Sequence, residues 1–232
     1  MCTSIVYNGR NSLVGLNLDI LDMQYRVSAC SKHVWIEIWN EKEGWLPLFG
    51  VNEFGDFVHM PTCWPFDARS NPSNPYQENI LQMDMDLLSG KKNFAQTKAL
   101  AELKKICSMP GITYQAQIAD HNGNVLQVVP GQGTEYLERP KHAIMTNFSL
   151  YKGSQEKHPW MGMDRYLKAE KMIEDAGEEL DALGLMDILK EVSQTLCPTV
   201  VSMVYDHADN IVIWCEDRMY DSLSSQKIIL SE

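Results

Sequence analysis

The chain begins, after Met1, with Cys2-Thr3-Ser4-Ile5-Val6-Tyr7-Asn8-Gly9-Arg10-Asn11-Ser12-Leu13-Val14-Gly15-Leu16-Asn17-Leu18-Asp19. Residues 3–7 are rich in β-branched and aromatic side chains, which favour strands. Residues 8–11 have the composition of a tight turn, and residues 12–18 return as a second strand. The stretch therefore predicts a β-hairpin over residues 3–18, with Cys2 at its open end.

The rest of the sequence alternates between strand and helix patterns. Further strands are expected at 26–30, 33–39, 45–49, 113–119, 125–129, 142–146, 199–205 and 211–215, and helices at 78–88, 94–107, 164–176 and 180–196. Pro61–Pro75 has the composition of a long surface loop. This order predicts an α+β fold. Without an internal repeat or a linker, residues 1–232 are expected to form one domain.

Composition excludes several classes of function. Asp and Glu number 31 against 20 Lys and Arg, a formal net charge of −11, which repels nucleic acids and anionic lipid surfaces. The sequence has no secretory signal pattern and no apolar run long enough for a membrane span, so a cytoplasmic protein is expected. The six scattered cysteines and six histidines show no zinc-ligand spacing, so no metal or cofactor is expected.

Cys2 becomes a candidate nucleophile if Met1 is removed, as is common before a small residue. The same residue would then carry a thiol and a free α-amine, with reference pKa values of about 8.5 and about 7.7–8.0. A neutral amine with this pKa can act as the general base for its own thiol, without a histidine. With Met1 attached this base does not exist, and Cys2 is then an ordinary strand residue.

The motifs around and beyond Cys2 resemble the N-terminal-nucleophile cysteine hydrolases. More narrowly, the chain resembles the choloylglycine hydrolase family of linear amide hydrolases, which includes bile salt hydrolases, penicillin V acylases and relatives such as acid ceramidase. The segments that carry the resemblance occur in the family's order and span most of the chain: Cys2–Val6, Gly15–Asp19, Gly50–Gly55, Ala119–Val129, Met145–Asn147 and Asp164–Tyr166.

The resemblance implies a four-layer αββα sandwich with two packed antiparallel sheets. It also implies catalytic roles: Cys2 as nucleophile, Asp19 as the residue that holds the α-amine, Asn147 as an oxyanion-hole donor and Arg165 as a cation near the thiolate. The last three residues also have structural alternatives. Asp19 could be a hairpin-end residue, Asn147 a helix or turn cap, and Arg165 a solvent-exposed residue in the first turn of a helix.

Two positions depart from the family pattern. Leu16 stands where the family has an arginine beside the nucleophile, so a charge that favours the thiolate is absent and substrate binding at Leu16 is expected to differ. Thr62 aligns with an oxyanion-hole asparagine and is assigned a catalytic hydrogen bond. Trp64 and Phe66, in the Pro61–Pro75 loop, are assigned to an apolar substrate pocket.

The expected function is hydrolysis of a linear, non-peptide amide, such as a conjugated bile acid, a penicillin V-like compound or an N-acyl amine, through a Cys2 thioester. Two alternatives stay open. An acyltransferase would pass the same acyl group to an amine or alcohol, and a non-catalytic homologue would only bind an acyl ligand. The expected partner is thus a small-molecule N-acyl amide, and self-association into a homo-oligomer stays open.

Overall fold

The computed structural model describes residues 2–63, 74–108, 113–150 and 160–231. Its strands are β1 (Cys2–Asn8), β2 (Ser12–Asp19), β3 (Tyr25–Cys30), β4 (His33–Asn40), β5 (Gly44–Val51), β6 (Phe57–His59), β7 (Thr62–Cys63), β8 (Gln77–Asn79), β9 (Lys105–Cys107), β10 (Thr113–Tyr114), β11 (Ala116–Ala119), β12 (Val125–Val129), β13 (Gly133–Leu137), β14 (His142–Met145), β15 (Thr199–Asp206), β16 (Ile211–Glu216) and β17 (Ser224–Lys227). Its helices are α1 (Ile80–Leu88), α2 (Phe94–Leu103), α3 (Met163–Ala176) and α4 (Ala182–Glu191).

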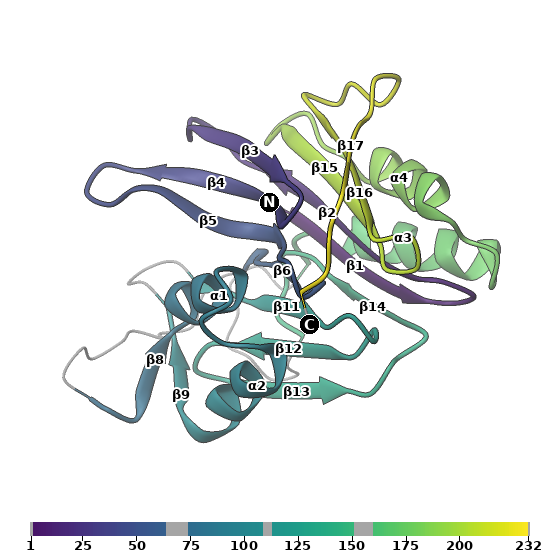
Figure 1. Cartoon of the computed structure of the whole chain (residues 1–232). Helices are drawn as coiled ribbons and strands as arrows, with labels where there is room; N and C mark the ends of the chain where they lie inside the picture. Colours follow the sequence, from purple (N-terminus) through teal and green to yellow (C-terminus); the bar gives the residue numbers. More distant parts are fainter. Residues whose placement is uncertain (1, 64–73, 109–112, 151–159, 232) are drawn as a thin grey trace.

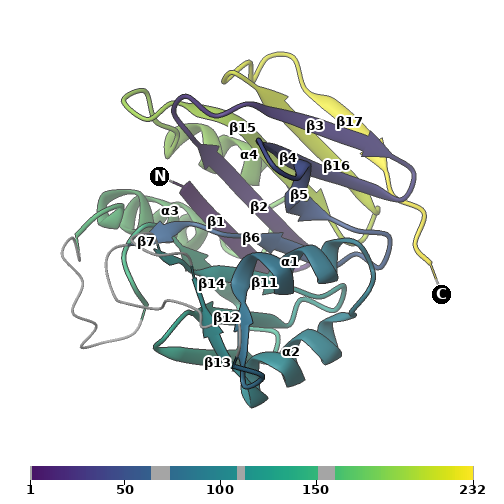
Figure 2. The ribbon, with the colours of Figure 1, turned by 90° about the vertical axis from the view of Figure 1, so that its left-hand side faces the viewer.

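Two large antiparallel sheets form the centre of the molecule. The first, sheet A, has the order β14-β1-β2-β15-β16-β17, and the second, sheet B, has the order β13-β12-β11-β6-β5-β4-β3. Helices α3 and α4 lie against sheet A, whereas α1 and α2 lie against sheet B on the other side of the molecule (Figures 1 and 2). The predicted α+β sandwich with its αββα layers is therefore confirmed.

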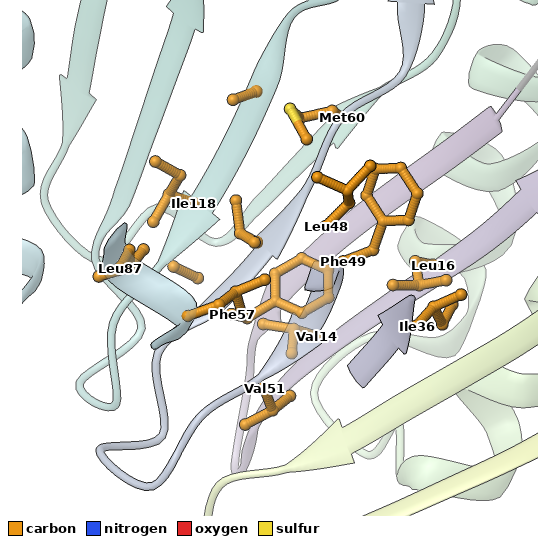
Figure 3. Close-up of a cluster of buried hydrophobic side chains, with 14 of the residues drawn as sticks. Val14, Leu16, Ile36, Leu48, Phe49, Val51, Phe57, Met60, Leu87 and Ile118 are labelled. Carbon is orange, nitrogen blue, oxygen red and sulfur yellow. The ribbon is translucent and has the colours of Figure 1, made fainter. Parts of the chain in front are cut away.

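The predicted hairpin forms the middle of sheet A, and its alternating side chains fill two separate cores. One face of the hairpin, including Cys2, Leu16 and Leu18, belongs to the core shared with sheet B. Figure 3 shows Leu16 in this core, together with Ile36 of β4 and Phe49 of β5. The other face packs with α3 and α4, and Gly15 gives α4 a close approach, since a Cβ there would lie 3.2 Å from the side chain of Leu185.

Several predicted element bounds are wrong because pairing with distant segments overrides local pattern. The helix expected over 94–107 ends at Leu103, and Lys105–Cys107 instead pairs in parallel with Gln77–Asn79. For the same reason the helix expected over 78–88 begins at Ile80. The strand expected over 113–119 is interrupted at Gln115, whose side chain donates hydrogen bonds to the carbonyls of residues 146 and 148.

Further differences occur elsewhere in the chain. The helix expected over 180–196 covers only Ala182–Glu191, because Asp181 caps it and the chain turns after Val192. Short strands β6, β13 and β17 were not predicted. Among the described residues, no helix is long and apolar enough to cross a membrane.

Candidate active site

Cys2 lies at the start of β1, in the middle of sheet A. Cys2 pairs with Leu18 of the neighbouring strand β2, and only 4% of its surface is exposed. Its main-chain nitrogen donates a hydrogen bond of 2.8 Å to Asn147 Oδ1, while its Sγ lies 4.0 Å from the carbonyl oxygen of Asp19. Burial raises the pKa of the Cys2 thiol to about 11, and the Asp19 carboxylate also raises it. The thiol is therefore protonated at neutral pH in this arrangement.

Arg165 reaches Cys2 from the first turn of α3. Its Nη1 donates to the Cys2 carbonyl oxygen at 2.6 Å and to Thr3 Oγ1 at 2.8 Å, and its Nη2 donates to Asn147 Oδ1 at 2.6 Å. Gly162, at φ 78°, precedes the helix; a Cβ there would lie 2.6 Å from Nη2. Only glycine tolerates both that backbone conformation and this close approach. Arg165 is therefore buried and hydrogen-bonded to Cys2, Thr3 and Asn147, and it is not exposed to solvent.

Asp19 is a buried carboxyl group at the end of β2, 1% exposed. Thr199 Oγ1 donates to its Oδ1 at 2.6 Å, Gln194 Nε2 donates to its Oδ2, and Arg165 Nη1 lies 3.7 Å from Oδ2. Burial raises the pKa of Asp19 to about 6, while these donors and the guanidinium oppose the rise. Asp19 is therefore mainly ionised at neutral pH and forms the anionic part of the site.

Asn147 is placed next to Cys2 by the pairing of β14 with β1, in which Met145 lies opposite Ser4. Its Oδ1 accepts from the Cys2 nitrogen and from Arg165, and its Nδ2 donates to the Thr62 carbonyl at 2.6 Å. The Asn147 amide oxygen therefore holds the Cys2 nitrogen. The oxyanion-hole roles expected of Asn147 and of the Thr62 hydroxyl stay predictions.

An apolar cavity of about 240 Å³ opens beside Cys2. Its lining comes from both sheets and from α1, and consists, among the described residues, of Cys2, Leu18, Asp19, Ile20, Met23, Ile38, Trp39, Asn40, Leu46, Leu48, Phe49, Met60, Thr62, Leu81 and Tyr114. Cys2 and the polar Asp19, Asn40 and Thr62 stand against an otherwise mainly aliphatic and aromatic wall. This arrangement suits an apolar group attached to a polar reacting centre.

The predicted substrate-binding residues have different outcomes. Leu16 is fully buried in the core between the sheets, and the cavity is lined instead by Leu18, two residues further along β2. Trp64 and Phe66 lie outside the described residues. The structure therefore brings together Cys2 and the polar residues predicted from the sequence, while Leu16 packs as a core residue.

Sequence reasoning missed Thr199, the first residue of β15, and Gln194, in the loop before it, which both bind Asp19. No motif marks them, because their contact with Asp19 joins segments about 180 residues apart. Thr3 was also missed as a partner of Arg165. Within the described residues, no group of three or more His, Cys, Asp or Glu side chains could hold a metal ion.

Comparison with known proteins finds similar structures but no match by sequence. No protein-family model matches the chain, and no curated protein matches it either. A cysteine-to-alanine mutant of the conjugated bile acid hydrolase from Clostridium perfringens superposes with a TM-score of 0.68 and 11% identity, covering 98% of this chain and 92% of that one. An arginine-to-leucine variant of the same hydrolase gives 0.67 and 12%, covering 97% and 92%.

Penicillin V acylase from Agrobacterium tumefaciens is a third similar structure. It gives a TM-score of 0.64 and 13% identity, covering 93% of this chain and 83% of that one. Identities this low establish likeness of fold and not of substrate. The chain therefore has the fold of the conjugated bile acid hydrolase and penicillin V acylase structures, as the sequence resemblance predicted.

Proposed function

We propose that this protein hydrolyses linear N-acyl amides, with Cys2 as the nucleophile. The observation that carries the proposal is the two-sided setting of Cys2. On one side it lines an apolar cavity, and on the other its main-chain nitrogen and carbonyl are held by Asn147 and Arg165. A residue that is only a strand residue needs neither the cavity nor the buried polar cluster.

The proposed reaction begins with removal of Met1, which turns the Cys2 nitrogen into a primary amine. The amine takes the thiol proton as Sγ attacks the carbonyl carbon, and the tetrahedral intermediate collapses with cleavage of the C–N bond. The amine returns the proton to the leaving nitrogen, and a thioester forms. Water then attacks the thioester, gives one proton to the thiolate through the amine, and releases the carboxylic acid.

Removal of Met1 also favours the thiolate. The neutral amide nitrogen of Cys2 is replaced by an amine that carries a positive charge when it is protonated, and a nearby positive charge lowers a thiol pKa. Arg165 contributes in the same direction. These charges oppose the burial that keeps the thiol protonated, and they take over a function that an arginine at position 16 would otherwise serve.

Cavity size supports a modest acyl group. A 150 Å³ apolar cavity holds a benzene ring, so by proportion the 240 Å³ beside Cys2 has room for about ten carbon atoms. A steroid nucleus with its side chain is larger than this. We therefore propose acyl groups that are medium-length alkyl chains or carry a single aromatic ring.

A non-catalytic acyl binder is the second candidate, and two observations favour it. The thiol pKa of about 11 and the uncharged core packing of Leu16 both disfavour a thiolate. Such a protein would bind an N-acyl amide without releasing its amine. Acyl transfer would instead appear as a new amide when an amine acceptor is added.

The test compares release of glycine from acetyl-, octanoyl-, decanoyl- and cholylglycine by wild type and Cys2→Ala. We expect release by the wild type alone, with kcat/KM highest for the octanoyl or decanoyl substrate. Binding of decanoylglycine without release of glycine would support the second candidate. Equal release by Cys2→Ala would contradict the proposed nucleophile.

A further inference from the structure

A β-bulge in β15 places a threonine directly opposite Asp19. The pairing of β15 with β2 is regular from Asp206 down to Val201, which lies opposite Leu18, but the next pair joins Thr199 to Asp19 and skips Val200. Bulges change the direction in which a side chain points, and they occur often beside active sites. Without this one, Val200 would oppose Asp19 and no hydroxyl would face the carboxylate.

The skipped residue is held in place from another part of the sheet. The Val200 carbonyl oxygen accepts a hydrogen bond of 2.9 Å from the Asp217 main-chain nitrogen. The Tyr25 hydroxyl, from β3 of sheet B, lies 3.4 Å from the same oxygen. The bulge is therefore supported from both sheets.

Thr199 and Gln194 bind each other as well as Asp19. The Gln194 main-chain nitrogen donates to Thr199 Oγ1 at 2.9 Å, and the Thr199 main-chain nitrogen donates to the Gln194 carbonyl at 3.1 Å. Because Oγ1 accepts from Gln194, its own proton is directed to Asp19 Oδ1 at 2.6 Å. The Gln194 side chain donates to Oδ2, so each carboxylate oxygen has a donor, one from β15 and one from the loop before it.

We propose that Gln194 and Thr199 are positioning residues that fix both oxygens of Asp19 beside Cys2. The inference rests on the proposed function. Asp19 faces the Arg165 guanidinium from α3, and its charge acts on the Cys2 thiol of β1. Arg165 in turn binds Asn147 and the Cys2 carbonyl. A carboxylate held by two neutral donors stays ionised and in place, which keeps this chain of contacts aligned.

The experiment titrates Asp19 directly, by ¹³C NMR of its carboxyl carbon in protein labelled at aspartate, with the signal assigned from Asp19→Asn. We expect a midpoint near pH 6 in the wild type. In Thr199→Val it should rise by about one pH unit, because a lost hydrogen bond to a charged group disfavours the ionised form. Thr199→Ser keeps the donor and should titrate like the wild type.

Thr97→Val is the matched control, since Thr97 is also fully buried but its hydroxyl has no hydrogen-bond partner among the described residues. It should leave the Asp19 midpoint unchanged. Gln194→Met should also raise the Asp19 midpoint, because it removes the donor to Oδ2, and it replaces Thr199→Val in the test if that variant does not fold. An unchanged midpoint in the folded variants of both positions would overturn the proposal.

The pH dependence of kcat and KM is measured on the same proteins. The acidic limb of kcat should move with the NMR midpoint, whereas KM should change less than twofold. A lowered melting temperature with an unmoved limb would contradict positioning. The midpoint can move although neither the wild type nor any variant releases amine. In that case the proposed function is wrong, while the positioning of Asp19 by Gln194 and Thr199 is supported.

Discussion

Two buried carboxyl groups of this protein have opposite surroundings. Asp19 on β2 has a donor on each oxygen and a guanidinium 3.7 Å away, and its pKa is raised to about 6. Asp84 on α1 is fully buried, and within the described residues neither of its oxygens has a hydrogen-bond partner. Burial raises the pKa of Asp84 well above its ordinary value.

The difference shows what the polar cluster around Cys2 accomplishes. Burial alone drives a carboxyl group into its neutral form, as at Asp84. At Asp19, hydrogen-bond donors and a cation oppose this effect, so a negative charge persists at neutral pH in a buried site. The comparison therefore separates a buried carboxylate that stays charged from a buried carboxyl group that stays protonated.

The largest expected effect comes from removing the cation. Arg165→Met leaves Asp19 without its guanidinium and removes the donors to Asn147 and to Cys2. Breaking a buried ion pair in this way costs about 3–5 kcal/mol of unfolding free energy. Misplacement of the nucleophile should slow acylation of Cys2 by about 100-fold. Urea unfolding and rapid-quench mass spectrometry measure the two effects.

Arg10→Met is the control for this comparison. Arg10 pairs with Glu179 at 2.7 Å, but both side chains are mostly exposed. Solvent screens such a pair, so the variant should lose less than about 1 kcal/mol and acylate normally. Equal losses in the two variants would show that Arg165 has no special role.

The next effect concerns pH. In the proposed mechanism Asp19 must be ionised to orient Cys2, and its pKa is about 6. Above this pH the carboxylate persists, whereas below it the group is protonated, so protonation of Asp19 should lower the acylation rate about tenfold for each pH unit below 6, beyond the loss caused by protonating the α-amine base. Single-turnover rates from pH 4 to 8 measure the limb. A rate that stays constant down to pH 4 would contradict the role of Asp19.

The third effect is at Asp84, and it concerns stability. The folded state keeps Asp84 protonated, while the unfolded state loses the proton above about pH 4. The contribution of Asp84 to the free energy of unfolding is therefore greatest at low pH and is lost as pH rises. The loss is about 1.4 kcal/mol per pH unit. Asp84→Asn removes this dependence, so it should unfold like the wild type at pH 4 and be more stable than it at pH 7.

Asp86, two residues along α1, is the matched control of opposite sign. Although burial acts to raise its pKa, hydrogen bonds and charge from Lys92 lower it overall. Its contribution is therefore present above the ordinary Asp pKa and lost as pH falls, so Asp86→Asn should be less stable than the wild type at pH 7. If both variants shift stability in the same direction, the contrast between paired and unpaired carboxyl groups is wrong.

The N-terminal hairpin could be predicted because it is local, whereas the chemistry of Cys2 stays a prediction. The order of motifs in the chain then implied the sandwich and the partners Asp19, Asn147 and Arg165, which the structure brings together. Not every motif serves the site. Asn52 in the Gly50–Gly55 motif accepts from its own turn and donates to the Leu87 carbonyl, a structural role.

Other features depend on contacts that a sequence pattern does not contain. The bulge that aims Thr199 at Asp19 arises from pairing between strands at opposite ends of the chain. Strand β9 reads as the end of a helix until it is paired with β8. Leu16 was assigned to the substrate because of the arginine expected at that position, but it lies two residues from the cavity-lining Leu18 on the same face of β2 and packs in the core between the sheets.

The proposed acylation of Cys2 is tested most directly by mixing the wild type or Cys2→Ala with decanoylglycine, quenching the reaction and measuring the intact mass of the protein. The account predicts a wild-type chain that lacks Met1 and carries one decanoyl thioester on Cys2, formed within the first turnover and absent from the variant. A chain that retains Met1, or acyl groups spread over the other cysteines, would contradict it.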